Sequence, residues 1–322
     1  MTTDRIISLR ARLDGGLIPA VPVPFDSHER LHRGAQDAYV SHLAAQPVAG
    51  VAVWAHTGRG LMLDDATARQ VLRDWRAALP DRVVIAGAGS AQAFTADLAT
   101  DQSVRMAERA AELGADALLV YAPAWLRGRA KAEDLIIRHH VRLAQVGLPL
   151  VLFYLYEAAG GISYSPAVLD ELLSLPGVVG IKVATLDSVM TYQDISRQML
   201  ARHPDKLLIT GEDRFLGYSL RRGARAVLIG MGAVCSAMQA ELIRAHLEGD
   251  AARFLALSDA ADRLAEAVFI APMEGYIRRL LWALAHLDII PLEAANDPWG
   301  PALSASEFSE LGRTLASLES FR

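Results

Sequence analysis

The stretch Pro176-Gly177-Val178-Val179-Gly180-Ile181-Lys182-Val183-Ala184 is the most informative part of this chain. Its run of β-branched and apolar residues predicts a buried strand. A lysine in such a strand is unusual, because burial disfavours the charged form of the amine. Of the 32 basic residues only Lys131, Lys182 and Lys206 are lysines. Burial also supplies a neutral amine near pH 7, which is what attack on a carbonyl to form a Schiff base requires.

Similar apolar runs recur along the chain with starts about 20 to 34 residues apart, the length of one strand, one helix and two loops. With the lysine stretch, the predicted strands are Leu17–Val23, Gly50–Trp54, Val83–Gly87, Ala117–Tyr121, Leu150–Tyr154, Val178–Val183, Leu207–Thr210 and Ala226–Ile229. Amphipathic segments between them predict helices, for example Thr67–Leu79, Asp101–Leu113, Ala132–Gln145 and Ser165–Leu175. Eight such units predict an α/β fold, a (β/α)8 TIM barrel.

A doubly wound sheet is the competing architecture, but it would usually carry a glycine-rich turn after its first strand. Here Gly15-Gly16 precedes that strand. We expect the barrel, with a short N-terminal segment, to occupy residues 1–236. Residues 237–322 should form a C-terminal helical extension packed on the barrel, with helices at Ala252–Phe269 and Tyr276–Leu287.

Composition limits the possible partners and location. The net charge of -5 gives no general attraction to nucleic acid or to an anionic membrane. No apolar stretch approaches the roughly 20 residues that span a bilayer, and the N-terminus has no signal-peptide core. The single cysteine, Cys235, excludes internal disulfides and cysteine-cluster metal sites. These features predict a cytoplasmic protein.

Active sites of barrels lie at the C-terminal ends of the strands. In this chain those ends are rich in polar and aromatic residues: Ala55-His56-Thr57-Gly58-Arg59, Gly87-Ala88-Gly89-Ser90, Tyr121-Ala122-Pro123-Ala124-Trp125, Phe153-Tyr154-Leu155-Tyr156, Ile181-Lys182 and Gly211-Glu212-Asp213. We therefore expect one pocket at this end of the barrel.

These segments together resemble the dihydrodipicolinate synthase / N-acetylneuraminate lyase family of Schiff-base barrels. Gly180-Ile181-Lys182-Val183-Ala184-Thr185 is the most specific match, because it is similar to the strand that carries the family's Schiff-base lysine. Ile18-Pro19-Ala20-Val21-Pro22-Val23-Pro24-Phe25 resembles the family's first strand. The resemblance runs from about Gly16 to Val234 and continues more loosely to the end of the chain.

The second-strand motif departs from the family pattern, Gly-Thr-Thr-Gly-Glu. Thr57 matches the threonine that, with backbone N–H groups, holds the carboxylate of a 2-oxo acid. His56 replaces a threonine of the proton relay, and Arg59 replaces the glutamate. The resemblance implies substrate binding by Thr57, the amides around Gly58, and Arg59. Gly211 and Ile229, at the ends of the last two strands, are further expected substrate-binding residues.

The fifth strand leaves an ambiguity. The family carries a catalytic tyrosine 28 residues before the lysine, which gives Tyr154, whereas counting forward from Pro149 gives Phe153. We expect Tyr154 to face the pocket, because only a hydroxyl can transfer protons. An arginine that binds the second substrate in the synthases is replaced by Ala159. This argues against a dihydrodipicolinate synthase proper.

The resemblance implies a lyase or aldolase that makes or breaks a C–C bond next to pyruvate or a related 2-oxo acid. Lys182 would form the imine, Tyr154 would act as acid and base, and His56 would exchange a proton with the substrate. It also implies no cofactor beyond the covalent imine, no metal, an aldehyde as second substrate, and a homo-oligomer, tetrameric or dimeric. A dehydratase of a 2-keto-3-deoxy sugar acid would use the same imine chemistry.

Two readings from other classes stay open. His28-Glu29-Arg30-Leu31-His32 matches the His-Glu-x-x-His signature, which on a helix can hold zinc for a hydrolase. The segment follows a turn and has no apolar stripe, which disfavours a helix. The altered second-strand motif also permits a barrel that only binds its ligand and catalyses nothing.

Overall fold

The computed structural model describes residues 3–91, 95–129 and 131–321. Its centre is one sheet of parallel strands in the order β1-β8-β7-β6-β5-β4-β3-β2. A parallel bridge between Ala20 and Ala52 joins β1 to β2 and closes the ring. The eight-stranded barrel is therefore confirmed. The strands are β1 (Leu17–Pro19), β2 (Gly50–Val53), β3 (Val83–Ala88), β4 (Ala117–Val120), β5 (Leu150–Leu155), β6 (Val178–Ala184), β7 (Leu207–Thr210) and β8 (Ala226–Ile229).

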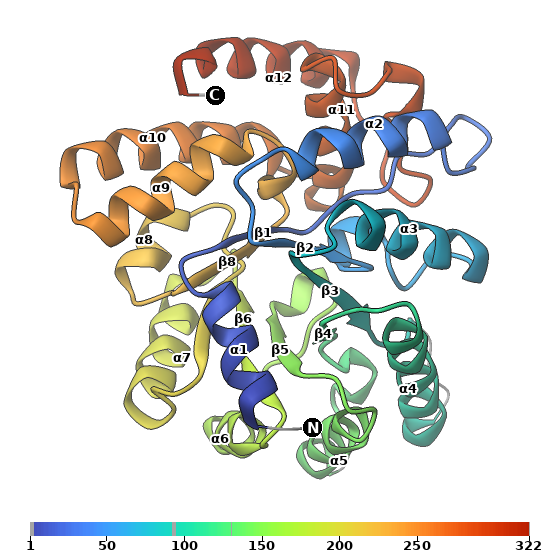
Figure 1. Ribbon diagram of the computed structural model, residues 1–322, viewed down its shortest axis with the longest axis vertical. Helices are drawn as coiled ribbons and strands as arrows, with labels where there is room; N and C mark the ends of the chain where they lie inside the picture. The colour runs from blue at the N-terminus through green and yellow to red at the C-terminus, as the bar shows by residue number, and fades with distance from the viewer. Residues whose placement is uncertain (1–2, 92–94, 130, 322) are drawn as a thin grey trace.

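Helices surround the strands, as Figure 1 shows. Those that follow the eight strands in turn are α2 (Arg33–Ala44), α3 (Asp65–Ala78), α4 (Ala96–Glu112), α5 (Ala132–Ala144), α6 (Pro166–Ser174), α7 (Val189–Arg202), α8 (Leu216–Arg221) and α9 (Ser236–Glu248). The start of α6 illustrates how the sequence sets such a boundary. Ser165 accepts a hydrogen bond from the amide of Val168, and Pro166 occupies the first helical position, where its missing N–H costs nothing.

The described residues form four further α-helices. Helix α1 (Thr3–Leu13) leads into β1 and contacts β3 and β6. Helices α10 (Ala251–Val268), α11 (Tyr276–His286) and α12 (Ala305–Ser317) follow α9, and α10 packs on α9 (Figure 1). The boundary between barrel and extension at residue 237 stays a prediction.

Strand β1 is shorter than the sequence predicts, since it ends at Pro19 instead of Val23. Pro22 and Pro24 have no N–H to donate to a neighbouring strand, so the ladder cannot continue through them. The segment after β1 stays buried nevertheless, and Val21 N donates to Ala52 O. This segment packs against the turn that carries His56 and Thr57, since a Cβ at Gly58 of that turn would lie 2.7 Å from Val21 O.

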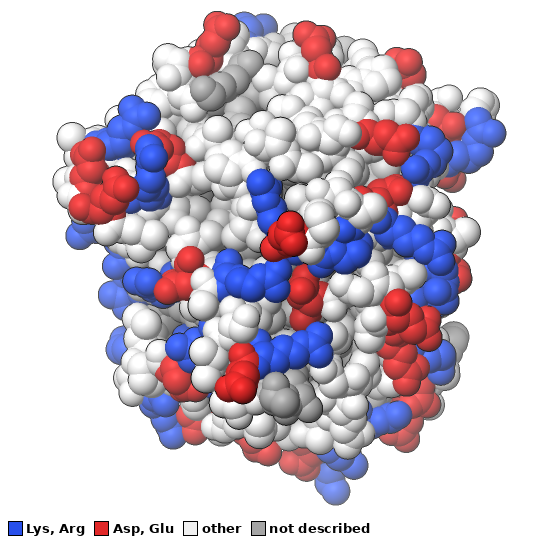
Figure 2. Space-filling view, in the orientation of Figure 1, with Lys and Arg blue, Asp and Glu red and all other residues white. Residues whose placement is uncertain are grey.

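The surface mixes charges of both signs. On the face shown in Figure 2, basic and acidic side chains are interspersed rather than segregated. Within the described residues, no helix has the length and apolar character that crossing a membrane requires.

Candidate active site

Lys182 lies near the C-terminal end of β6, and only 6% of its surface is exposed. Its amine lies 4.4 Å from the centroid of the Phe153 ring. Burial lowers the pKa of Lys182 to about 8, although Asp213 and Glu212 favour the charged form. The side chain reaches a pocket of about 430 Å³, including its opening to solvent, which we call the lysine pocket. It is lined by His56, Thr57, Phe153, Leu155, Tyr156, Ala159, Lys182, Ala184, Leu186, Gly211, Asp213, Gly230, Phe269, Met273, Glu274 and Tyr276.

Gly211 follows β7 and makes room for the lysine. A Cβ at this position would lie 2.7 Å from Lys182 Cε and 2.9 Å from Ala184 Cβ. Real Cβ atoms do not approach other heavy atoms so closely, so any side chain here would displace the amine. Gly211 therefore acts by leaving space.

Two buried carboxyl groups follow Gly211, and the sequence did not identify their roles. Glu212 accepts hydrogen bonds from the amides of Thr185 and Leu186, at 2.6 and 2.9 Å, and so holds the loop after β6. Asp213 lines the lysine pocket and accepts a hydrogen bond from Met231 N at 2.7 Å. Burial raises the pKa of both carboxyl groups to about 7. Asp213 is therefore positioned to balance positive charge on the Lys182 nitrogen.

Phe153, and not Tyr154, faces the lysine pocket. In the ladder between β5 and β6, Phe153 pairs with Lys182 and Tyr154 pairs with Val183, so the two β5 side chains point to opposite sides of the sheet. The Tyr154 ring packs against Tyr164, with centroids 5.8 Å apart. This placement corrects the expectation that Tyr154 faces the pocket. The physical reason is an irregularity between Leu150 and Val151 that shifts the pairing of β5 with β6 by one residue, so that Phe153 and not Tyr154 lies opposite Lys182. Counting residues along the sequence cannot detect such a shift.

The turn after β2 carries the three residues expected to bind and relay. His56, Thr57 and Gly58 form a 3-10 turn, and His56 and Thr57 line the lysine pocket. The amide of Gly58 donates to Ala55 O and that of Arg59 donates to His56 O, at 3.0 and 3.1 Å. These two N–H groups are therefore engaged within the turn, and the turn presents the side chains of His56 and Thr57 to the pocket.

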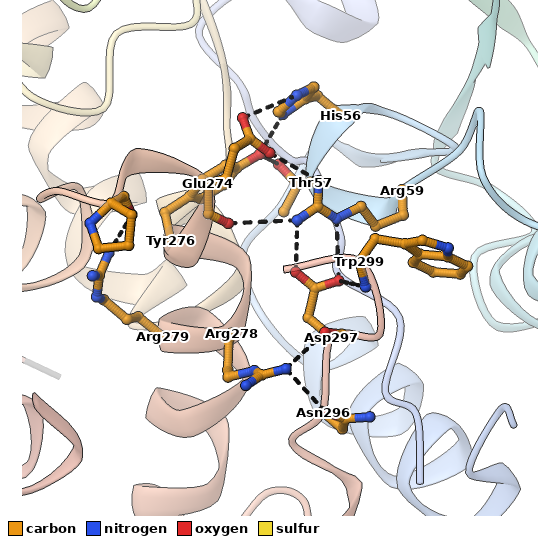
Figure 3. Close-up of polar contacts among 11 residues, drawn as sticks. His56, Thr57, Arg59, Glu274, Tyr276, Arg278, Arg279, Asn296, Asp297 and Trp299 are labelled. Carbon is orange, nitrogen blue, oxygen red and sulfur yellow. Dashed lines mark hydrogen bonds and ion pairs between the residues drawn. The ribbon is translucent and has the colours of Figure 1, made fainter. Parts of the chain in front are cut away.

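Arg59 contacts carboxylates of the protein itself (Figure 3). Its guanidinium donates two hydrogen bonds to Asp297, at 3.1 and 2.7 Å, and one to Glu274 at 2.8 Å. The Asp297 side chain is 1% exposed. Arg59 lies outside the lysine pocket, and its guanidinium ties the turn after β2 to two segments of the C-terminal region. This geometry favours a tethering role over the expected contact with a substrate carboxylate.

The C-terminal region also supplies a tyrosine that the sequence analysis missed. Tyr276, the first residue of α11, points its hydroxyl at the turn after β2 (Figure 3). The oxygen lies 3.0 Å from His56 Nδ1 and 3.1 Å from Thr57 Oγ1. Glu274 Oε1 lies 3.6 Å from His56 Nε2. Nothing local in the sequence marks Tyr276, because it is 219 residues from Thr57.

The remaining expected residues lie at the margins of the site. Ile229 is buried in β8 and accepts a hydrogen bond from Ala20 N through its backbone, while its neighbour Gly230 lines the lysine pocket. A second, wider cavity shares His56, Leu155 and Ala159 with the lysine pocket. We call it the outer cavity; it is also lined by Arg59, Leu61, Met62, Ser90, Ala91, Tyr121, Ala122, Ala124, Trp125, Arg127 and Gly160.

The His-Glu-x-x-His segment does not form the helix that a zinc hydrolase needs. Glu29 lies in a turn with φ of 60°, and α2 begins only at Arg33. His32 caps that helix, where its Nδ1 accepts a hydrogen bond from Ala35 N at 3.1 Å. Within residues 3–91, 95–129 and 131–321, no group of three His, Cys, Asp or Glu side chains is arranged to hold a metal ion. His28 and His32 therefore do not share a helix face.

Comparison with known proteins agrees with this arrangement. The 4-hydroxy-tetrahydrodipicolinate synthase of Synechococcus sp. (strain CC9605) is 30% identical over 258 residues, which cover 79% of this chain and 80% of that protein. The N-acetylneuraminate lyase of Citrobacter koseri is 25% identical over 289 residues, covering 89% and 91%.

The fold matches solved structures as well. One of them is the crystal structure of YagE, a prophage protein of the dihydrodipicolinic acid synthase family from E. coli K12, in complex with pyruvate. YagE superposes on this chain with a TM-score of 0.82 at 20% identity, over 94% of this chain and 98% of YagE. The sequence profile of the Dihydrodipicolinate synthetase family matches residues 14–317. The profile and the relatives confirm the resemblance found in the sequence: this chain belongs to the Dihydrodipicolinate synthetase family.

Proposed function

We propose that this protein is a lyase that binds pyruvate or a related 2-oxo acid as an imine on Lys182. The observation that carries the proposal is the placement of the Lys182 amine, buried at the end of β6 and lining one pocket together with Thr57 and Asp213. A pKa lowered to about 8 leaves a useful fraction of neutral amine at pH 7. A lysine paired only for stability would need neither the pocket nor the space left by Gly211.

The neighbouring groups have roles that follow from their positions. The Thr57 hydroxyl would contact the carboxylate of the bound 2-oxo acid. Asp213 would stabilise the protonated imine, because opposite charges attract strongly where water is excluded. His56 would exchange protons at the edge of the pocket, where it also borders the outer cavity.

The outer cavity is the natural site for the second substrate. It adjoins the lysine pocket through His56, Leu155 and Ala159, and it carries Arg127 and Trp125 on its wall. In the synthases an arginine follows the strand-five tyrosine by five residues. Counted from Phe153 that position is Ala158, and counted from Tyr154 it is Ala159, so the arginine is absent in either case. This supports an aldehyde other than the one used by dihydrodipicolinate synthases.

The test is borohydride trapping. Pyruvate and borohydride should add one pyruvyl group to the protein, detected by intact mass and located by peptide mapping. The chain has only three lysines, so mapping assigns the site without ambiguity. Lys182→Ala should abolish the adduct and Lys131→Ala should retain it. Absence of an adduct with pyruvate and with longer 2-oxo acids would refute the proposal and favour a barrel that only binds its ligand.

Once the imine is trapped, product analysis separates the two reactions considered. An aldolase releases free pyruvate and an aldehyde from its substrate, whereas a dehydratase of a 2-keto-3-deoxy sugar acid releases water and keeps the carbon chain intact. Absence of a separate cofactor, a cytoplasmic location and a homo-oligomeric assembly stay predictions.

A further inference from the structure

Imine formation requires a group that gives and takes protons, because water must leave the carbon that the amine attacks. In this chain the β5 side chain that faces Lys182 is Phe153, whose ring has no exchangeable proton. The Tyr154 side chain lies on the opposite side of the strand, where its ring packs against Tyr164. Strand β5 therefore does not supply the hydroxyl that its family counterpart carries.

Tyr276 brings a hydroxyl to the same pocket from the C-terminal region. The residue is 7% exposed and lines the lysine pocket together with Lys182. Its ring stacks on Phe269, with centroids 4.8 Å apart and planes 20° from parallel. Gly230 leaves the space it needs, since a Cβ there would lie 3.2 Å from Tyr276 Cε2 and 3.1 Å from Thr57 Oγ1. The ring is thus packed against Phe269 on one side and close to Gly230 on another.

The hydroxyl is also connected to solvent. It lies 3.0 Å from His56 Nδ1, and the other ring nitrogen of His56 lies 3.6 Å from Glu274 Oε1. The Glu274 side chain is 42% exposed. The His56 side chain is itself 24% exposed, so the contact between Tyr276 and His56 connects the pocket to solvent, and Glu274 lies beside that histidine. Burial raises the pKa of Tyr276 above its ordinary value, which keeps the hydroxyl protonated at neutral pH.

We propose that Tyr276 is the catalytic acid and base of this enzyme, in place of a strand-five tyrosine, and that His56 and Glu274 link it to solvent. The inference rests on the proposed function, because it assigns the proton transfers of the same imine. It makes the C-terminal region part of the catalytic machinery.

The proton transfers balance as follows. As Lys182 Nζ bonds to C2 of the 2-oxo acid, Tyr276 gives its proton to the carbonyl oxygen and then recovers one from the nitrogen, which yields a neutral carbinolamine. Tyr276 next protonates the departing hydroxyl, so that water leaves and the protonated imine forms. The resulting tyrosinate removes a proton from C3, and the electron pair of that C–H bond gives the enamine. One water is released and Tyr276 is neutral again.

Two readouts test the assignment on the full chain. Exchange of the C3 hydrogens of pyruvate with deuterium oxide, followed by proton NMR, reports the C3 proton transfer, and borohydride trapping reports the imine. Tyr276→Phe should slow exchange by about 100-fold or more, the scale of general acid–base catalysis, while the pyruvate concentration that half-saturates exchange changes little. Tyr218→Phe removes a hydroxyl from α8, where it accepts from Gln193, and should exchange like wild type.

Further variants guard against a folding defect in Tyr276→Phe. His56→Gln leaves the tyrosine in place but interrupts the link to solvent, and it should slow exchange by about tenfold or more. Tyr276→Phe combined with Phe153→Tyr returns a hydroxyl to the ring beside Lys182 and should recover part of the lost rate.

The two proposals fail differently. If the wild type forms no trapped adduct, the proposed function is wrong. If the wild type forms the adduct and Tyr276→Phe exchanges as fast as wild type, only the assignment of Tyr276 is overturned. Loss of exchange in Tyr154→Phe but not in Tyr276→Phe would likewise overturn it.

Discussion

Replacing Arg59 by methionine distinguishes two roles for this residue, a structural link to the C-terminal region and a ligand of the substrate carboxylate. The substitution keeps the length of the side chain but removes the guanidinium, and Asp297 then loses two hydrogen bonds at 3.1 and 2.7 Å. Because the Asp297 side chain is 1% exposed, water cannot replace them. Breaking a buried pair in this way costs about 3 to 5 kcal/mol. Glu274 adds little, since its side chain is 42% exposed and remains solvated.

The assay is unfolding in urea, followed by circular dichroism. The loss of unfolding free energy is calculated from the shift in the midpoint urea concentration, provided that the dependence of the free energy on urea is the same in both proteins. Arg197→Met is the matched control, because its partner Asp194 and Arg197 itself are 65% and 71% exposed, and such a pair contributes less than about 1 kcal/mol. Arg59→Met with Asp297→Asn should lose less than Arg59→Met alone, since no buried charge is left unpaired.

A different outcome would refute the tether. If Arg59→Met unfolds within about 1 kcal/mol of wild type and instead raises the KM for the 2-oxo acid, then Arg59 binds substrate, as the sequence analysis expected. The ion pair with Asp297 would then be incidental to stability.

Three further outcomes follow from the site. Gly211→Ala places a methyl group 2.7 Å from Lys182 Cε. The rate of borohydride trapping with pyruvate should fall at least about tenfold, and the free energy of unfolding should fall by about 1 to 3 kcal/mol. An unchanged trapping rate would show that the lysine moves freely. Burial lowers the pKa of Lys182 to about 8, so the trapping rate should rise about tenfold per pH unit up to pH 8 and level off above it. A rise that continues to pH 10 would contradict a lowered pKa of this lysine. The pKa of Glu212 is raised from 4.5 to about 7, so the folded state holds that proton more tightly than the unfolded state does. The free energy of unfolding should therefore fall as the pH rises from 4.5 to 7, and Glu212→Gln should make this slope shallower. An equal slope in both proteins would count against a raised pKa of Glu212.

The fold could be predicted from the sequence because its signals are local. Each of the eight predicted strands starts at the residue where the structure starts it, since buried parallel strands are short apolar runs bounded by turns. The end of β1 could not be predicted in the same way. Apolar residues continue to Val23, and only the prolines among them end the ladder.

The site could be predicted only where its residues lie within one motif. Lys182, His56 and Thr57 occupy strand ends and line one pocket. The choice between Phe153 and Tyr154 depended on a bulge, which shifts the register by one residue and leaves no mark on composition. Tyr276, Glu274 and Asp297 reach the site through tertiary packing, and no spacing rule connects them to the turn after β2.

The late position of these residues has a consequence for how the protein is made. Synthesis proceeds from the N-terminus, so the strand that carries Lys182 leaves the ribosome well before Met273, Glu274 and Tyr276. Until those residues arrive, one wall of the lysine pocket is missing. A nascent chain would therefore carry the amine in an open, incomplete pocket, and the finished enzyme would appear only at the end of translation.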